Sequence, residues 1–116
     1  MVNVASAVRT TYCGVGQAAP AGMVFVIIDA VVYNNGDAYI WVDVGYFSII
    51  DSEGHEYASG GCVLPYIEAF KSTSIAPGRS NSGKVVFVVL DIAEDLAVSY
   101  LLSGAPPVLA VWDLGL

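Results

Sequence analysis

The sequence predicts an all-β domain, a sandwich of about seven to eight antiparallel strands that takes in residues 1–116. Runs rich in Val, Ile, Phe and Tyr, which favour strands, are separated by short stretches of Gly, Pro, Asn and Ser, which favour turns. These turn signals recur at intervals of about 8–12 residues, a spacing typical of sandwiches. A chain of 116 residues is large enough for one hydrophobic core and too small for two.

Residues 2–9 form the first predicted strand, and residues 10–22 form a loop rich in small residues. Residues 23–33 form a central strand that is apolar at both sets of alternate positions, apart from Asp29. We therefore expect both faces of this strand to be covered. The segment Asn34-Asn35-Gly36-Asp37 then predicts a tight turn to the next strand, since Asn and Gly tolerate the positive φ that such turns require.

Residues 38–50 form a long strand that we expect to bend at Gly45, because glycine inside a strand often marks a bulge or a switch between sheets. Phe47 and Ile49 then point together into the core. The sequence Asp51-Ser52-Glu53-Gly54 predicts a longer hairpin turn with its glycine in the left-handed conformation. The further predicted elements are strands at residues 55–59, 70–75, 84–90 and 108–114, the last terminal or at an edge, and one helical turn at residues 91–96.

The composition is apolar and acidic. Hydrophobic residues make up 56% of the chain and charged residues 13%, about half the usual charged share. The formal net charge is −7 and the four Lys and Arg residues are scattered, which argues against binding of nucleic acid or of an anionic membrane surface. No apolar run approaches the ~20 residues of a membrane-spanning helix. The start of the chain carries no export signal, and we expect such a signal to have been removed.

Two cysteines, Cys13 and Cys62, lie in Gly- and Ala-rich loops beside predicted strand ends. Their placement allows a disulfide that bends no regular element, and it also allows two separate buried thiols. A zinc site is not indicated, because the chain has one histidine and no Cys-x-x-Cys pair. No cofactor is predicted.

Two glycine-rich segments imitate nucleotide-binding motifs. Residues 78–84 match the spacing of a phosphate-binding loop, but Val85 replaces the required Ser or Thr and opens a strand instead of a helix. Residues 14–19 imitate a dinucleotide fingerprint, but Pro20 and Gly22 prevent the helix that would bind the pyrophosphate. The sequence also contains no credible Ser/His/Asp triad and no blue-copper ligand set, so we predict that the protein is not an enzyme.

Titratable residues are dense only around His55, in the predicted hairpin. The carboxylates of Asp51 and Glu53, together with His55, are a candidate site for a small ligand or a divalent cation, which is the alternative function. The simpler interpretation is a solvated hairpin whose acidic residues favour the turn.

Several turn and core segments together resemble a known family. They are residues 25–37 (FVIIDAVVYNNGD), 47–57 (FSIIDSEGHEY), 77–78 (PG) and 82–89 (SGKVVFVV). Over residues 2–100 the chain is similar to a secreted immunoglobulin-like domain of unknown function, which is attached to many bacterial and archaeal surface proteins and lipoproteins. That domain is grouped with the mycobacterial immunoprotective extracellular antigen. The resemblance implies an immunoglobulin-like β-sandwich, an exported protein and no catalytic residues. The cysteine pair, the apolar second face around Phe25 and Ile27, and the Pro106-Pro107 tail depart from the family pattern.

The exported character that the resemblance implies favours a bond between Cys13 and Cys62, since disulfides persist in oxidising compartments. It also favours an extracellular or cell-surface location. We predict a non-enzymatic module that contacts another protein or a second copy through aromatic and apolar side chains, because Tyr and Trp offer contact area at little cost in rotamer entropy. The candidate surface residues are Phe25, Ile27, Tyr33, Trp41 and Tyr46, with Tyr39 and Tyr66.

Self-association is expected from the central strand. A two-layer sandwich buries only one face of each sheet in its own core, so Met23, Phe25, Ile27 and Val31 need a cover. The cover is either the protein's own loops or a second subunit. We expect a second subunit, and therefore a homo-oligomer.

Overall fold

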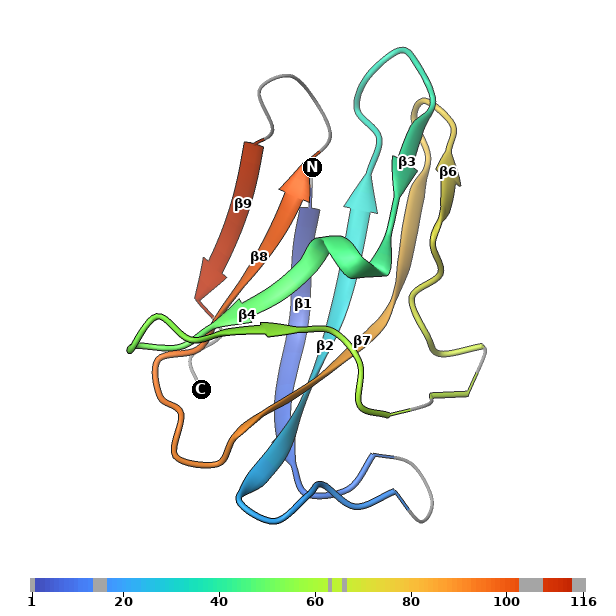
Figure 1. The fold of residues 1–116 in the computed structure, drawn as a ribbon. Coiled ribbons are helices and arrows are strands. Elements are labelled where there is room, and N and C mark those ends of the chain that lie inside the picture. Colours follow the sequence, from blue (N-terminus) through green and yellow to red (C-terminus); the bar gives the residue numbers. More distant parts are fainter. Residues whose placement is uncertain (1, 14–16, 63, 66, 103–107, 114–116) are drawn as a thin grey trace.

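In a computed structural model the chain folds as two packed layers of antiparallel strands (Figure 1). The structure describes residues 2–13, 17–62, 64–65, 67–102 and 108–113. Within this part of the chain lie one 3₁₀ turn, η1 (Val44–Tyr46), and nine strands: β1 (Val2–Thr10), β2 (Met23–Tyr33), β3 (Ile40–Val42), β4 (Phe47–Ile50), β5 (Glu56–Ala58), β6 (Thr73–Ile75), β7 (Ser80–Leu90), β8 (Ala97–Leu102) and β9 (Val108–Asp113). The predicted all-β sandwich is confirmed.

Three sheets make up the two layers. β1, β2 and β7 form one layer in the order β1-β2-β7, while β5-β4-β8-β9 and the short pair β3-β6 lie opposite (Figure 1). The main core fills the space between them. Phe47 on β4 and Phe87 on β7 are fully buried there, and the Phe47 ring centroid lies 4.6 Å from that of Tyr100 on β8. Burial raises the pKa of the Tyr100 hydroxyl to about 12.

The alternation along β2 gives one face to the core and one to the outside, as the sequence predicts. Asp29 lies on the outer face, in register with Ser6 of β1 and Lys84 of β7. The Ser6 hydroxyl donates to Asp29 Oδ2 at 2.6 Å, and Lys84 Nζ lies 3.2 Å from Asp29 Oδ1. The Ser6 hydrogen bond, helped by Lys84 and opposed by desolvation, lowers the pKa of Asp29. The acid that interrupts the apolar strand thus belongs to a polar row across three strands.

The tight turn predicted at residues 34–37 is wrong. β2 pairs with β1 and β7, whereas β3 pairs with β6 of another sheet, so these residues connect two sheets instead of two paired strands. Neither asparagine nor Gly36 takes a positive φ. Turn propensity indicates where the chain changes direction, but the partners of the flanking strands decide the conformation.

The predicted bend at Gly45 is confirmed. Residues 38–50 divide into β3 and β4, which belong to different sheets and are joined by η1. The Asp43 side chain caps η1, because its Oδ1 accepts a hydrogen bond from the Gly45 backbone amide at 2.8 Å. The hairpin that follows also forms as predicted, with Gly54 at a φ of 84°.

The second half of the chain differs from prediction at four places. β7 begins at Ser80, four residues early, because β2 pairs with it as far as Tyr33↔Ser80. β8 was not predicted, although it lies between β4 and β9 in its sheet. Residues 91–96 form turns and bends instead of a helical turn, and the strand predicted at 70–75 is confined to β6. The terminal strand is confirmed over β9; residue 114 lies outside the described residues.

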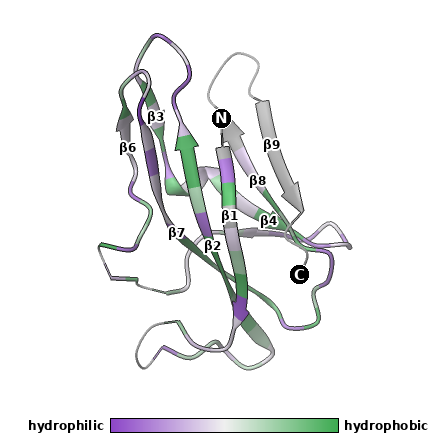
Figure 2. Cartoon of the chain, turned by 180° about the vertical axis from the view of Figure 1, so that it is seen from behind, coloured by the Kyte–Doolittle hydropathy of each residue, from purple (hydrophilic) through white to green (hydrophobic). Residues whose placement is uncertain are grey.

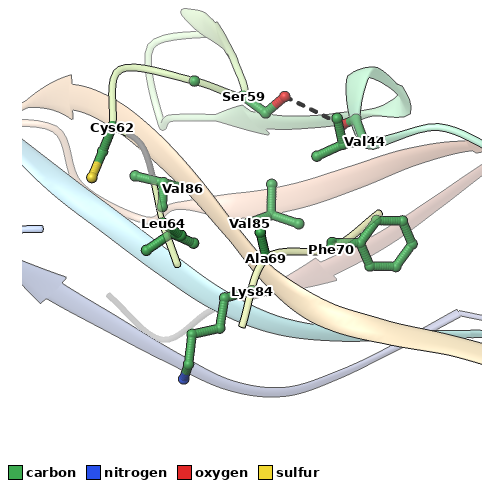
Figure 3. Close-up of a pocket in the computed structure, with 10 residues that line it drawn as sticks. Val44, Ser59, Cys62, Leu64, Ala69, Phe70, Lys84, Val85 and Val86 are labelled. Carbon is green, nitrogen blue, oxygen red and sulfur yellow. Dashed lines mark hydrogen bonds between the residues drawn. The ribbon is translucent and has the colours of Figure 1, made fainter. Parts of the chain in front are cut away.

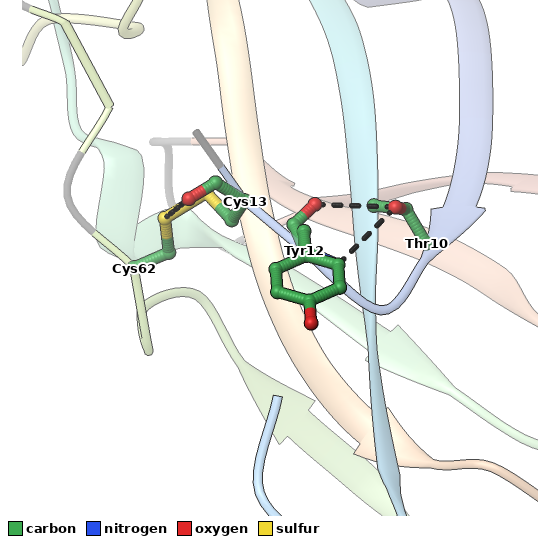
Figure 4. The surroundings of a disulfide bond; sticks show 4 residues. All are labelled: Thr10, Tyr12, Cys13 and Cys62. Carbon is green, nitrogen blue, oxygen red and sulfur yellow. Dashed lines mark hydrogen bonds between the residues drawn. A yellow bond between two sulfur atoms is a disulfide. The ribbon is translucent and has the colours of Figure 1, made fainter. Parts of the chain in front are cut away.

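Two loops cover part of the outer face of the β1-β2-β7 sheet. The described parts of these loops, residues 11–13 and 17–22 and residues 59–62, 64–65 and 67–70, are joined there by a disulfide between Cys13 and Cys62, whose Cα atoms are 6.3 Å apart (Figure 4). Phe25 of β2 is 1% exposed beneath them, in a second apolar cluster with Cys13 and Val86. The expectation that a second subunit covers Phe25 is therefore wrong, because the protein's own loops do so.

The second loop crosses the edge of β7 at Gly83. Phe70 N donates to Lys84 O at 3.0 Å, and Lys84 N donates to Glu68 O at 2.8 Å. A Cβ atom at Gly83 would overlap the Phe70 backbone. Gly78, at a φ of 76°, makes the turn before β7. The glycine spacing that imitates a phosphate-binding loop is thus explained by a turn and a close crossing of two backbones.

Candidate functional site

One end of the sandwich is built from two connections that lie side by side (Figure 1). Residues 34–39 join β2 to β3, and residues 76–79 join β6 to β7. We call this end, residues 33–41 and 74–80, the tip. The backbone amide of Asn34 donates to Arg79 O at 2.9 Å, and Asn34 O accepts from Gly78 N at 2.9 Å. The two connections are therefore held together directly.

The buried side chain of Asn34 fixes the tip further. Asn34 is 2% exposed. Its Nδ2 donates to Ala38 O at 2.8 Å and to Ile75 O at 2.9 Å, and its Oδ1 accepts from Gly36 N at 3.0 Å. An amide has both donors and an acceptor, so one asparagine can satisfy three backbone groups that the crossover leaves unpaired. The loops of the tip are thereby ordered without a partner.

Aromatic side chains project from this fixed frame. Tyr33, Tyr39 and Trp41 are 40%, 72% and 49% exposed. Trp41 points outward because its neighbours Ile40 and Val42 turn toward the core, and its indole Nε1 donates to Asp43 Oδ2 at 3.4 Å. The other exposed positions of the tip hold mainly small and polar residues, and Figure 2 shows the loop between β2 and β3 mainly in hydrophilic colours. The exposed members of this set are Asn35, Gly36, Asp37, Ala38, Ser74, Gly78, Arg79 and Ser80.

The predicted surface residues are thus divided by the fold. Tyr33 and Trp41 lie at the tip, where Tyr39 joins them. Phe25 is buried, which corrects its placement on an exposed surface, and Ile27 is partly buried beside it. Tyr46 is partly buried and packs edge-on against the Tyr100 ring, with centroids 5.9 Å apart. Tyr66 lies outside the described residues.

The Asp51 carboxylate, in the hairpin of the alternative site, is surrounded by hydrogen-bond donors. Its Oδ1 accepts from the backbone amides of Glu53 and His55 at 3.0 and 2.9 Å. Its Oδ2 accepts from the Tyr57 hydroxyl at 3.1 Å and lies 3.1 Å from His55 Nδ1. Desolvation, the largest influence, would raise the pKa of Asp51, but the donors from His55, Tyr57 and Glu53 together lower it. The carboxylate is thus used to close the hairpin.

The other residues of the hairpin add no cluster of ligands. Glu53 Oε2 lies 3.8 Å from His55 Nδ1, and both side chains are largely exposed. Desolvation and then the Asp51 hydrogen bond raise the pKa of Tyr57. In the part of the chain that the structure describes, no three His, Cys, Asp or Glu side chains lie close enough together to hold a metal ion.

An apolar cleft of about 240 Å³ lies between β7 and the loop of residues 59–70 (Figure 3). Its two polar side chains are already engaged. The Ser59 hydroxyl donates to Val44 O at 3.2 Å, and Lys84 Nζ pairs with Asp29 on the outer face of the sheet. The rest of the lining is apolar side chain and backbone, mainly Leu64, Ala69, Phe70, Val85 and Val86. Among the described residues that line it, the cleft therefore brings no reactive groups together.

None of the helical segments in the described ranges is long and apolar enough to cross a membrane.

The family model described as "Domain of unknown function (DUF4352)" matches residues 1–105. The chain belongs to this family. The family resemblance inferred from the core and turn segments is thereby confirmed. No curated protein sequence matches the chain significantly.

Solved structures of similar fold include three bacterial proteins. YjhA of Bacillus subtilis has a TM-score of 0.74 at 11% identity, over 97% of this chain and 89% of that one. The secreted protein MPT63 of Mycobacterium tuberculosis has a TM-score of 0.69 at 17% identity, over 97% of this chain and 80% of that one. YcdA of Bacillus subtilis, a candidate lipoprotein, has a TM-score of 0.74 at 17% identity. The match covers 97% of this DUF4352 chain but only 35% of YcdA, so the chain spans about a third of that protein's length. At these identities the likeness shows the β-sandwich fold alone.

Proposed function

We propose that this DUF4352 domain is a non-enzymatic module that binds another protein outside the cell or at its surface, and that the tip makes the contact. The observation that carries the proposal is the set of exposed aromatic side chains on loops locked by the buried Asn34. Binding loops rich in Tyr, Ser, Gly and Asn with an occasional Trp combine rigid contact area with adaptable hydrogen bonding. The tip has this composition.

Preorganisation strengthens the case for the tip. A loop that must be ordered on binding loses affinity to conformational entropy, whereas a loop held by internal hydrogen bonds does not. Asn34 makes five such bonds, through its backbone and its side chain. The tip loops are thus ordered when the domain folds, and binding does not have to order them.

Two observations support a location outside the cytosol. Cys13 and Cys62 form a disulfide, a bond typical of oxidising compartments. Similar folds occur in MPT63, which is named a secreted protein, and in YcdA, which is named a candidate lipoprotein.

The proposal is tested by comparing three forms of the domain as baits for cell-surface and secreted proteins of the source organism. The forms are the wild type, the double variant Tyr39→Ala/Trp41→Ala and the control Ile67→Ala, which removes an almost fully exposed apolar side chain elsewhere. Aromatic hot spots contribute about 2 kcal/mol or more each. We expect a protein captured by the wild type and the control, and lost from the double variant. Equal capture by all three forms, or no capture by the wild type, would overturn the proposal.

A further inference from the structure

Strand β1 is an open edge of its sheet. Among the described strands it pairs only with β2, at the edge of the order β1-β2-β7. The opposite edge, β7, is covered by the protein itself: Gly60 N donates to Val86 O at 2.8 Å, and residues 68–70 exchange hydrogen bonds with Lys84. The same sheet therefore has one edge capped by its own chain and one edge that no other described strand pairs with.

The sequence of β1 has little that would keep another strand away. Edge strands are commonly protected by outward charges, especially Lys, or by Pro. β1 (VNVASAVRT) has no Pro, and its one charged side chain, Arg9, is tied to the sandwich because its guanidinium donates to Asp91 O at 3.1 Å and Ala93 O at 2.7 Å. Its one irregularity is a register shift between Val4 and Ser6.

An apolar side chain is exposed beside this edge. Val8 is 53% exposed and stands in register with the partly buried Ile27 on the outer face. Figure 2 shows β1 in green and pale colours between hydrophilic bands near its two ends. A strand added along β1 would cover Val8 and so remove apolar surface from water.

The distribution of charge indicates which strand can be added. The whole chain carries −7, which should drive two copies apart. The β1-β2-β7 sheet, however, contains only two bases, Arg9 and Lys84, and one acid, Asp29, a net charge of +1. Of the other ten acidic residues, Asp91, Glu94 and Asp95 line a hollow with Arg9 at one end of β1, and seven lie elsewhere. Contact along β1 is thus a way for two copies to meet while most of their carboxylates stay apart.

We propose that β1 pairs antiparallel with β1 of a second copy, so that two three-stranded sheets join into one across a two-fold axis. Such an isologous contact is self-complementary, and a register centred on Val8 places the two Val8 side chains opposite each other. This surface is separate from the tip. Because antiparallel pairing reverses the second copy, the two tips of the dimer point toward opposite ends.

The contact is tested first on the unmodified protein. A single strand edge buries less than the roughly 800 Å² per partner of a standard interface, so the dimer is expected to be weak. Sedimentation of the 12.1 kDa chain up to roughly 1 mM should show dimers forming with concentration. Amide exchange within residues 6–10, which a register centred on Val8 brings into contact, should slow over the same range. The proposal is overturned if the protein stays monomeric over the whole range, or if the exchange rates of these amides do not depend on protein concentration.

A matched pair of variants locates the contact. Val8→Lys places two ammonium groups opposite each other and should raise the dimer dissociation constant about tenfold or more. Ile67→Lys adds the same charge at an exposed apolar position on the loop that caps β7, and should leave dimerisation unchanged. If both variants weaken the dimer equally, or neither does, the contact is not at β1.

Discussion

Removal of the disulfide should cost the domain a large part of its stability. The bond joins residues 49 apart in the sequence, and loop closure of that length corresponds to about 4 kcal/mol in the chain-entropy model. A domain of this size has a total stability of roughly 5–15 kcal/mol. The double variant Cys13→Ala/Cys62→Ala should therefore still fold, because the main core does not include either cysteine, but with a much lower free energy of unfolding.

Urea unfolding of three samples measures this cost: the oxidised wild type, the wild type under a dithiol reductant, and the double variant. The last two should agree, with midpoints well below the first. Amide exchange should accelerate most in residues 11–13, 17–22 and 59–62, which belong to the two loops that the disulfide joins. Denatured, unreduced wild type should weigh about two daltons less than the reduced form. Two freely alkylating thiols in the native protein, or a double variant as stable as the wild type, would refute the reasoning.

Three further predictions concern the core, the crossing and the hairpin. Phe87→Ala should lower the free energy of unfolding by about 3–5 kcal/mol, and His55→Ala, at a largely exposed side chain, by far less; a reversed order in urea titrations would contradict the assigned strand faces. Gly83→Ala should cost about 1–3 kcal/mol, because its methyl group meets the Phe70 backbone; an unchanged melting temperature would show that the two backbones do not cross there. The pKa of Asp51 is lowered in the folded state, so the stabilisation from its ionised carboxylate is complete above the unfolded pKa near 4 and is lost as the pH falls through the folded pKa. Asp51→Asn should therefore flatten the acid limb of a plot of unfolding free energy against pH. An unaltered acid limb would assign the acid sensitivity to other groups.

The local pattern of the sequence was sufficient to predict much of the fold. The double alternation of β2 predicts a strand covered on both faces, and Gly45 predicts where the chain changes sheets. The polar turn before Gly54 predicts its hairpin. In each case the preference of a few neighbouring residues agrees with the tertiary structure, so no knowledge of distant partners is needed.

The errors arise where distant partners decide. Residues 34–37 favour a tight turn, but β2 already has neighbours on both sides, so the chain must cross to another sheet. β8 has a usable signal, because Val98 and Tyr100 alternate with smaller residues, but its short run stands beside an acidic segment. That Phe25 needs a cover follows from the pattern of β2, whereas the identity of the cover depends on two loops 49 residues apart.

Only part of the candidate site could be predicted from the sequence. Tyr33 and Trp41 could be singled out because large aromatic residues favour interfaces. Asn34 was assigned to a turn, and its role as a buried link between two loops depends on Ile75, which is 41 residues away. A buried amide of this kind leaves no local pattern, since its partners are backbone groups.

The row of Ser6, Asp29 and Lys84 has a consequence for how the strands find one another. β2 and β7 are both so apolar that many alignments would bury similar areas. A slip of β2 by one residue would turn Asp29 toward the core, where an unpaired carboxylate costs several kcal/mol. Only the native alignment keeps this charge beside both a hydroxyl and an ammonium group. One polar residue in an apolar strand therefore acts as an alignment mark, and its replacement by valine is expected to make assembly of the sheet less selective even if the folded state is no weaker.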